Sequence, residues 1–126
     1  MKSIAEVAKE FGVTTRTIRY YEELGLLYPQ RTVSNIRLFG PADCAKLKLI
    51  VRGKQYGFNL EEIKEMVLLF DQDRTGVKQL ERTIEYGKNR VAEVDVKIRE
   101  LQEIKSGMEM MLDEFSEKLA TLKGNV

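Results

Sequence analysis

A heptad repeat of apolar residues begins at Val77, runs almost to the end of the chain, and limits what this sequence can fold into. With Val77 at position a, twelve of the fourteen a and d positions over six heptads are apolar, and no proline interrupts them. Such a sustained 3.5-residue repeat predicts a coiled coil. A lone helix of about 69 Å cannot bury its seam on the short segment before it, so the sequence predicts a homodimer. The a and d positions are Val77, Leu80, Ile84, Gly87, Val91, Val94, Ile98, Leu101, Lys105, Met108, Leu112, Phe115, Leu119 and Leu122.

Charge is distributed unevenly between the N-terminal and C-terminal parts of the 126 residues. Residues 1–57 contain ten Lys/Arg and five Asp/Glu, a net charge of +5, and residues 58–126 contain eleven and fifteen, a net charge of −4. The basic N-terminal part indicates an anion-binding head, and the acidic C-terminal part is expected to have a different function. We therefore expect two parts, a head over residues 1–75 and a dimerisation helix over residues 76–126.

Cysteine and histidine usage restricts the chemistry and the compartment. The chain has one cysteine, Cys44, and no histidine, so an internal disulfide is impossible and no metal or cofactor is expected. The N-terminus lacks the apolar core of a signal peptide, and no apolar run reaches membrane-spanning length. We expect a cytoplasmic protein without membrane contact. No catalytic constellation is present either, which argues against an enzyme.

Two short helices joined by a tight turn are predicted at the N-terminus. Ser3 and Glu6 have the spacing of a capping box, Gly12 ends the first helix, and Thr14 caps a second helix that ends at Gly25. This is the pattern of a helix-turn-helix. An ordinary helical hairpin, the alternative, does not explain the polar side chains expected on the outer face of the second helix. These are Arg16, Thr17, Arg19 and Tyr20.

The segment after the second helix predicts a small wing. Residues 27–29 and 36–39 have the composition of short extended segments, and a polar loop joins them. Arg31 and Arg37 are expected on the flanks of this two-stranded wing. A third helix is predicted from Pro41 to about residue 56, and a fourth begins after a cap at Asn59. The solvent-facing basic residues of the third helix are predicted to be Lys46, Lys48, Arg52 and Lys54.

These elements, in this order, resemble the MerR family of transcriptional regulators. The motifs that carry the resemblance are Thr-Ile-Arg-Tyr-Tyr-Glu-Glu-Leu-Gly-Leu-Leu at 17–27, Arg-Leu-Phe at 37–39 and Gly-Phe-Asn-Leu-Glu-Glu-Ile-Lys at 57–64. Residues 46–58 are also similar to regulators of branched-chain amino-acid and fatty-acid breakdown genes. The resemblance implies a mainly α fold, with a winged helix-turn-helix head followed by a long helix that forms an antiparallel coiled coil. Charges at the e and g positions do not decide between parallel and antiparallel pairing.

The resemblance also implies a function. MerR-type activators bind a palindromic promoter site as homodimers and distort the DNA so that RNA polymerase engages the promoter. Arg16 and Arg19 share a helix face with Tyr20, and such side chains suit double-stranded DNA. The alternatives are a DNA-architectural or recombination accessory protein without an effector, and a coiled-coil adaptor that has lost DNA binding. The residues expected to contact DNA are Thr15, Arg16, Thr17, Arg19, Tyr20, Arg37 and Lys54.

The same resemblance limits the kind of signal that such a protein is expected to sense. Metal sensors of this family carry cysteines around the start of the long helix and beyond its end, and this chain has none after Cys44. We therefore expect no metal response. Thiol sensors of the family carry their cysteine near the position of Arg52, so Cys44 is expected to be a packing residue, with a redox switch as the alternative.

From Ile104 the apolar face of the long helix widens, which predicts either plain packing or a site for an apolar effector. The candidate effector residues are Met108, Met111 and Phe115.

Overall fold

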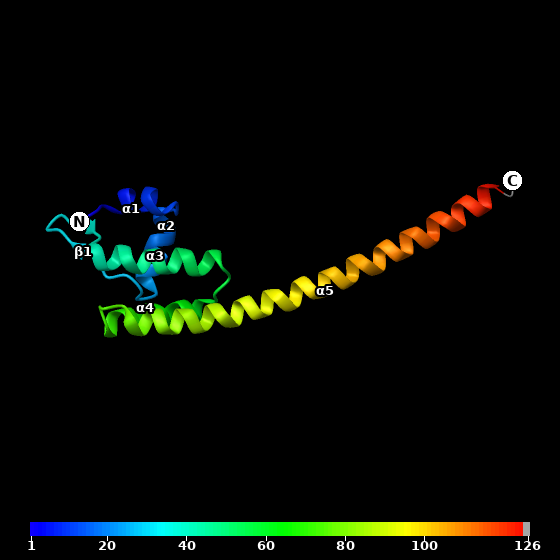
Figure 1. Ribbon diagram of the computed structural model, residues 1–126. Coiled ribbons are helices and arrows are strands. Elements are labelled where there is room, and N and C mark those ends of the chain that lie inside the picture. Colours follow the sequence, from blue (N-terminus) through cyan, green and yellow to red (C-terminus); the bar gives the residue numbers. More distant parts are fainter. Residues whose placement is uncertain (125–126) are drawn as a thin grey trace. The chain divides into compact units, whose positions relative to one another are not determined.

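The computed structural model describes residues 1–124, and most of them are helical (Figure 1). Five helices and one two-stranded sheet follow in the order α1 Ile4–Phe11, α2 Thr15–Glu23, β1 Gln30–Arg31, β2 Arg37–Leu38, α3 Pro41–Gln55, α4 Leu60–Gln72 and α5 Val77–Gly124. The chain forms two compact units, residues 1–86 and residues from 87 onward, and α5 runs from the first into the second. The mainly α fold with a wing and a long C-terminal helix is thereby confirmed.

The helix-turn-helix is formed by α1 and α2, and its boundaries follow from local capping. The Glu6 backbone N–H donates to the Ser3 hydroxyl at 3.2 Å, and the Ser3 N–H donates to the Glu6 carboxylate at 3.0 Å. Gly12 ends α1 in the left-handed conformation at φ 66°, which glycine adopts without steric cost. Thr14 then caps α2 through a bond from the Thr17 N–H at 3.1 Å. The predicted caps are therefore confirmed.

The wing is an antiparallel ribbon in which Gln30 faces Leu38 and Arg31 faces Arg37. Its second strand lies within the predicted segment, but the prediction of a first strand at residues 27–29 is wrong. Leu27 is instead buried in the core, and the Tyr28 N–H donates to the Asp43 carboxylate at 2.9 Å. These contacts fix the chain before the ribbon begins, so pairing starts only at Gln30.

The core of the first unit lies where α1, α2, α3 and α4 meet. It consists of twelve buried apolar residues, namely Val7, Ala8, Ile18, Tyr21, Leu26, Leu27, Phe39, Leu47, Ile50, Ile63, Met66 and Val67. Helices α3 and α4 approach closely because Gly53 has no side chain. A Cβ at that position would lie 3.1 Å from Cγ1 of Ile63, tighter than ordinary van der Waals contact. This packing holds α2 and the wing on one small scaffold.

Lys46 occupies a different environment from the one expected. The prediction that it faces solvent on α3 is wrong, because its side chain is 3% exposed and its Nζ lies 2.7 Å from the carboxylate of Asp71. The ammonium also lies 5.1 Å from the centre of the Tyr28 ring. A buried charge must be paired, and a carboxylate at the end of α4 supplies the partner. Lys46 therefore belongs to the packing of the head, whereas Lys48, Arg52 and Lys54 are exposed as predicted.

The first turns of α5 are fixed to α4 by polar contacts. Arg82 donates to the Glu65 carboxylate at 2.7 Å, and the Tyr86 hydroxyl donates to the other oxygen of the same carboxylate. The bond from Tyr86, followed by the bond from Arg82, holds the pKa of Glu65 below its usual value. The Thr83 hydroxyl also lies 3.0 Å from the sulfur of Met66. This part of the long helix is thus anchored within the first unit.

The seam of α5 is exposed in the single chain. Its twelve apolar a and d side chains, spread from Val77 to Leu122, are 46–64% exposed. Ile104 and Met111, beside the seam, are 57% and 43% exposed. Within the part of the chain that the structure describes, no helix is long and apolar enough to cross a membrane.

Candidate nucleic-acid interface

The outer face of α2 presents basic and aromatic side chains. Ile18 and Tyr21 are buried and hold the helix on the core, whereas Arg16, Arg19 and Tyr20 are exposed. The two neighbouring tyrosines divide as helical spacing predicts, with Tyr21 1% and Tyr20 46% exposed. Helical geometry places residues three and four apart on one face. Arg16, Arg19 and Tyr20 therefore form a single surface suited to phosphates and base edges.

Two threonines at the start of α2 are less accessible. Thr15 and Thr17 are both half-buried. The Thr17 hydroxyl lies 2.8 Å from the Thr14 hydroxyl and helps to fix the helix start. A hydroxyl has one proton and two lone pairs, so Thr17 retains capacity for a further hydrogen bond. The predicted DNA contacts of both threonines stay predictions.

The wing is connected to α2 by Glu22, a residue that the sequence did not single out. Nε of Arg37 donates to one carboxylate oxygen of Glu22 at 2.7 Å, and Nη2 of Arg31 donates to the other at 3.3 Å. The Glu22 and Arg37 side chains are 22% and 25% exposed. The structure thus places Arg37 beside the last turn of α2, as part of a three-charge cluster.

The end of α3 also lies close to α2. Lys54, an exposed residue in the last turn of α3, has its Nζ 5.3 Å from the centre of the Tyr21 ring. Attraction between a cation and an aromatic face favours this position. Lys54 is therefore brought to the helix that carries Arg16 and Arg19, and the first unit combines α2, the wing and the end of α3.

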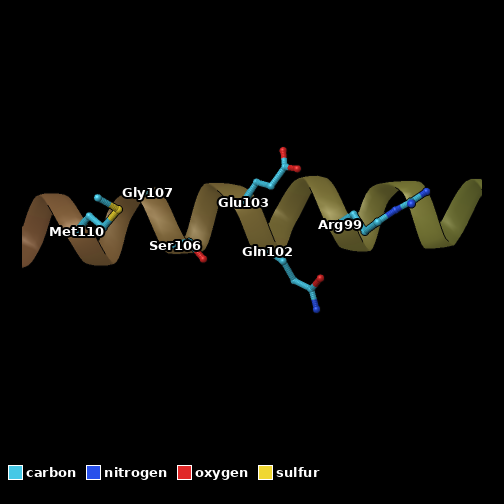
Figure 2. Close-up of a pocket in the computed structure, with 6 residues that line it drawn as sticks. All are labelled: Arg99, Gln102, Glu103, Ser106, Gly107 and Met110. Atoms are coloured by element: carbon cyan, nitrogen blue, oxygen red, sulfur yellow. The ribbon is translucent and has the colours of Figure 1, made fainter.

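The candidate effector residues lie on α5 in the second unit. Met108, Met111 and Phe115 are 54%, 43% and 55% exposed, and the single chain does not enclose them. A shallow depression nearby is lined by none of the three. Figure 2 shows its six lining residues on the one helix, with no second segment opposite them. They are Arg99, Gln102, Glu103, Ser106, Gly107 and Met110. This open depression offers no enclosed ligand site.

Cys44 has the environment of a packing residue. It is half-buried, and its side chain packs against the core of the head. Burial raises the pKa of its thiol, which disfavours the reactive thiolate. Among residues 1–124, no three Cys, His, Asp or Glu side chains are grouped in a way that could hold a metal ion.

Two protein-family descriptions match this chain, one over the N-terminal part and one from α3 into α5. Residues 2–68 match the family described as "MerR HTH family regulatory protein", and residues 44–111 match "MerR, DNA binding". The chain is 33% identical over 113 residues to the HTH-type transcriptional regulator HmrR of Rhizobium leguminosarum bv. viciae, covering 87% of this chain and 83% of that protein. It is 36% identical over 104 residues to "Heavy metal-dependent transcription regulator 2" of Rhizobium meliloti (strain 1021), covering 81% and 68% of the two chains.

Solved structures lead to the same family. A MerR family transcriptional regulator from Listeria monocytogenes is similar with a TM-score of 0.61 at 27% identity, over 99% of this chain and 93% of that chain. HiNmlR, a MerR family regulator lacking the sensor domain and bound to promoter DNA, has a TM-score of 0.59 at 26% identity, over 81% and 76%. With α2, the wing and α3 arranged as described, this chain belongs to the MerR family of DNA-binding transcriptional regulators.

Proposed function

We propose that this MerR-family protein binds a palindromic promoter site as a homodimer and distorts the DNA there. The observation that carries this proposal is the row of twelve apolar seam side chains that α5 leaves exposed in the single chain. Burial of apolar surface is worth about 25 cal/mol per Å², so a seam of this length strongly favours pairing. A second copy of the chain offers the matching seam. Residues 1–75 then serve as the DNA-binding head and residues 76–126 as the dimerisation segment.

Pairing explains why a palindrome is the expected target. Two identical heads related by a two-fold axis recognise two identical half-sites in opposite orientations. The family resemblance supports an antiparallel coil, which separates the heads. In each head, Arg16, Arg19 and Tyr20 would read the major groove, while Arg37 and Lys54 hold the flanking backbone. Thr15 and Thr17 would add contacts at the start of α2.

We further propose that the bound dimer bends or twists the promoter DNA. Contacts by two wings and two recognition helices can offset the elastic energy of bending or twisting a site. A distorted promoter would then engage RNA polymerase. A DNA-architectural protein would use the same head, so the two functions differ in the response of transcription to an effector and not in the interface.

Selection of binding sites from random duplex DNA tests the proposed target. The full-length protein is expected to enrich an inverted repeat, because two heads contribute to affinity together. An Arg16→Ala, Arg19→Ala double variant, which removes two exposed basic side chains of α2, is the control and should enrich no repeat. Enrichment of a single half-site, or of no sequence at all by the native protein, would contradict the proposal.

The signal is proposed to be something other than a metal ion. Two relatives are named as heavy metal-dependent regulators, and their similarity favours a metal response. The ligand types of this chain support our proposal, since soft metals are held by thiolate or imidazole and the chain has one cysteine and no histidine. We propose instead that Met108, Met111 and Phe115 contribute to an apolar effector site in the dimer, with plain packing as the alternative.

Zinc, copper or mercury salts are expected to change neither operator affinity nor promoter output. Cys44→Ser should retain any response to an apolar inducer, because a half-buried thiol with a raised pKa is a poor sensor. Met111→Glu should lose that response and keep its DNA affinity. The measurement is a titration of acyl-CoA and of each metal salt into the operator complex of the three proteins. A metal-dependent change in the native protein, or a response lost in Cys44→Ser and kept in Met111→Glu, would reverse the assignment.

A further inference from the structure

The carboxylate of Glu22 joins three segments of the head. It lies in the last turn of α2 and accepts from Arg37 of β2 at 2.7 Å and from Arg31 of β1 at 3.3 Å. The Glu22 and Arg37 side chains are about three-quarters buried, and Arg31 is more exposed. Isolated surface ion pairs contribute little, but a partly buried network of three charges constrains geometry more strongly. Both strands of the wing are thus connected to the recognition helix through a single residue.

The two arginines use their donors differently. Arg31 commits both terminal nitrogens, with Nη2 bound to Glu22 and Nη1 bound to the backbone and side-chain oxygens of Asn35. Arg37 commits only Nε, and within residues 1–124 its two terminal nitrogens have no hydrogen-bond partner. A guanidinium whose Nε is fixed keeps a fork of donors that matches two phosphate oxygens. Arg31 is therefore a brace for the wing, and Arg37 retains a free fork.

We propose that Glu22 is a positioning residue for DNA binding: it fixes Nε of Arg37 so that the two terminal nitrogens of this arginine are held ready for a backbone phosphate. The proposal rests on the DNA contact of Arg37 under the proposed function. Arg31 supports the arrangement by bracing the opposite strand against the same carboxylate. The side chain of Arg37 then loses little conformational freedom when DNA binds, and preorganisation of this kind increases affinity.

A positioning role for Glu22 predicts a change in DNA affinity that is opposite in sign to the change expected from net charge alone. Glu22 is an acid close to a surface that binds a polyanion, so its neutralisation should by simple electrostatics strengthen binding. If Glu22 instead positions Arg37, neutralisation should weaken binding. The sign of the change in DNA affinity therefore distinguishes two roles of the carboxylate. It either positions Arg37 for DNA, or it competes with DNA for Arg37.

The experiment is an operator titration over a series of salt concentrations with full-length variants. Glu22→Gln, which keeps the size of the side chain, is expected to weaken binding about tenfold, in line with a charge-assisted hydrogen bond. Arg37→Ala should weaken it to a similar extent and reduce the slope of log K against log salt by about one per head. The double variant should bind no worse than Arg37→Ala alone, because the two residues act through one contact. Glu22→Asp should recover part of the loss.

Arg31→Gln is the matched control, since it removes the other arginine from the same carboxylate. It should reduce thermal stability as much as Glu22→Gln does, and leave the salt slope unchanged because its fork is already occupied. Equal or tighter operator binding by Glu22→Gln, with Arg37→Ala weakened, would overturn the positioning role alone. Additive losses in the double variant would do the same. Unchanged affinity and slope in Arg37→Ala would overturn the wing contact of the proposed function as well.

Discussion

Replacing Leu101 with aspartate is expected to abolish both the dimer and operator binding. Leu101 is a d residue of α5, and its side chain is 64% exposed in the single chain. In the paired coil this side chain would be buried, and an unpaired buried carboxylate is strongly unfavourable. Two-fold symmetry introduces the charge twice. Because two linked heads bind with an avidity that one head lacks, the monomer should show no detectable binding to the operator.

Sedimentation and gel-shift titration of Leu101→Asp measure the two losses together. Ser106→Asp is the matched control, because it adds the same charge at an exposed b position of the same helix, outside the seam. This control should remain a dimer and bind DNA as the native protein does. Circular dichroism would show whether the head, whose core residues lie between Val7 and Val67, keeps its helices. A full dimer in Leu101→Asp would contradict the heptad register.

Removing the side chain of Arg19 is expected to weaken operator binding by about 1–3 kcal/mol, or roughly 5- to 150-fold, without affecting the dimer. Arg19 is exposed on α2, three residues after Arg16 and next to Tyr20. Within residues 1–124 it forms no ion pair, so Arg19→Ala leaves no internal partner uncompensated. The loss should therefore appear in DNA affinity and not in the thermal midpoint.

A gel-shift titration at physiological salt checks the Arg19 prediction. Arg99→Ala removes the same charge from an exposed position on α5, in the second unit, and should bind the operator with nearly native affinity. If Arg19→Ala and Arg99→Ala bind equally well, the exposed face of α2 does not contact the DNA.

The boundaries of the helices could be predicted from the sequence because they depend on neighbouring residues. Ser3 with Glu6, and Asn59 with Glu62, form capping boxes within four residues of chain, and both are present in the structure. The exposed and buried tyrosines of α2 also follow from helical periodicity. Short-range chemistry of this kind requires no knowledge of how distant segments pack.

The features that the sequence did not predict all depend on distant partners. The sequence neighbours of Lys46 are those of an exposed lysine, and only the packing of α4 on α3 brings the Asp71 carboxylate to its ammonium. Glu22 likewise has no special pattern, and its role depends on where β1 and β2 place their arginines. The first wing strand was predicted too early because Asp43 of α3 accepts the Tyr28 N–H. Long-range pairing of charged and polar groups leaves no periodic signal in the sequence.

The mass of protein in the complex with a single selected operator duplex tests the central claim most directly. The exposed seam of α5 and the basic surface of the head predict two chains on each duplex, one head for each half-site. Light scattering coupled to size-exclusion chromatography gives this mass without any variant. Two chains on each duplex is the expected result, and a stable complex that contains one chain would contradict it.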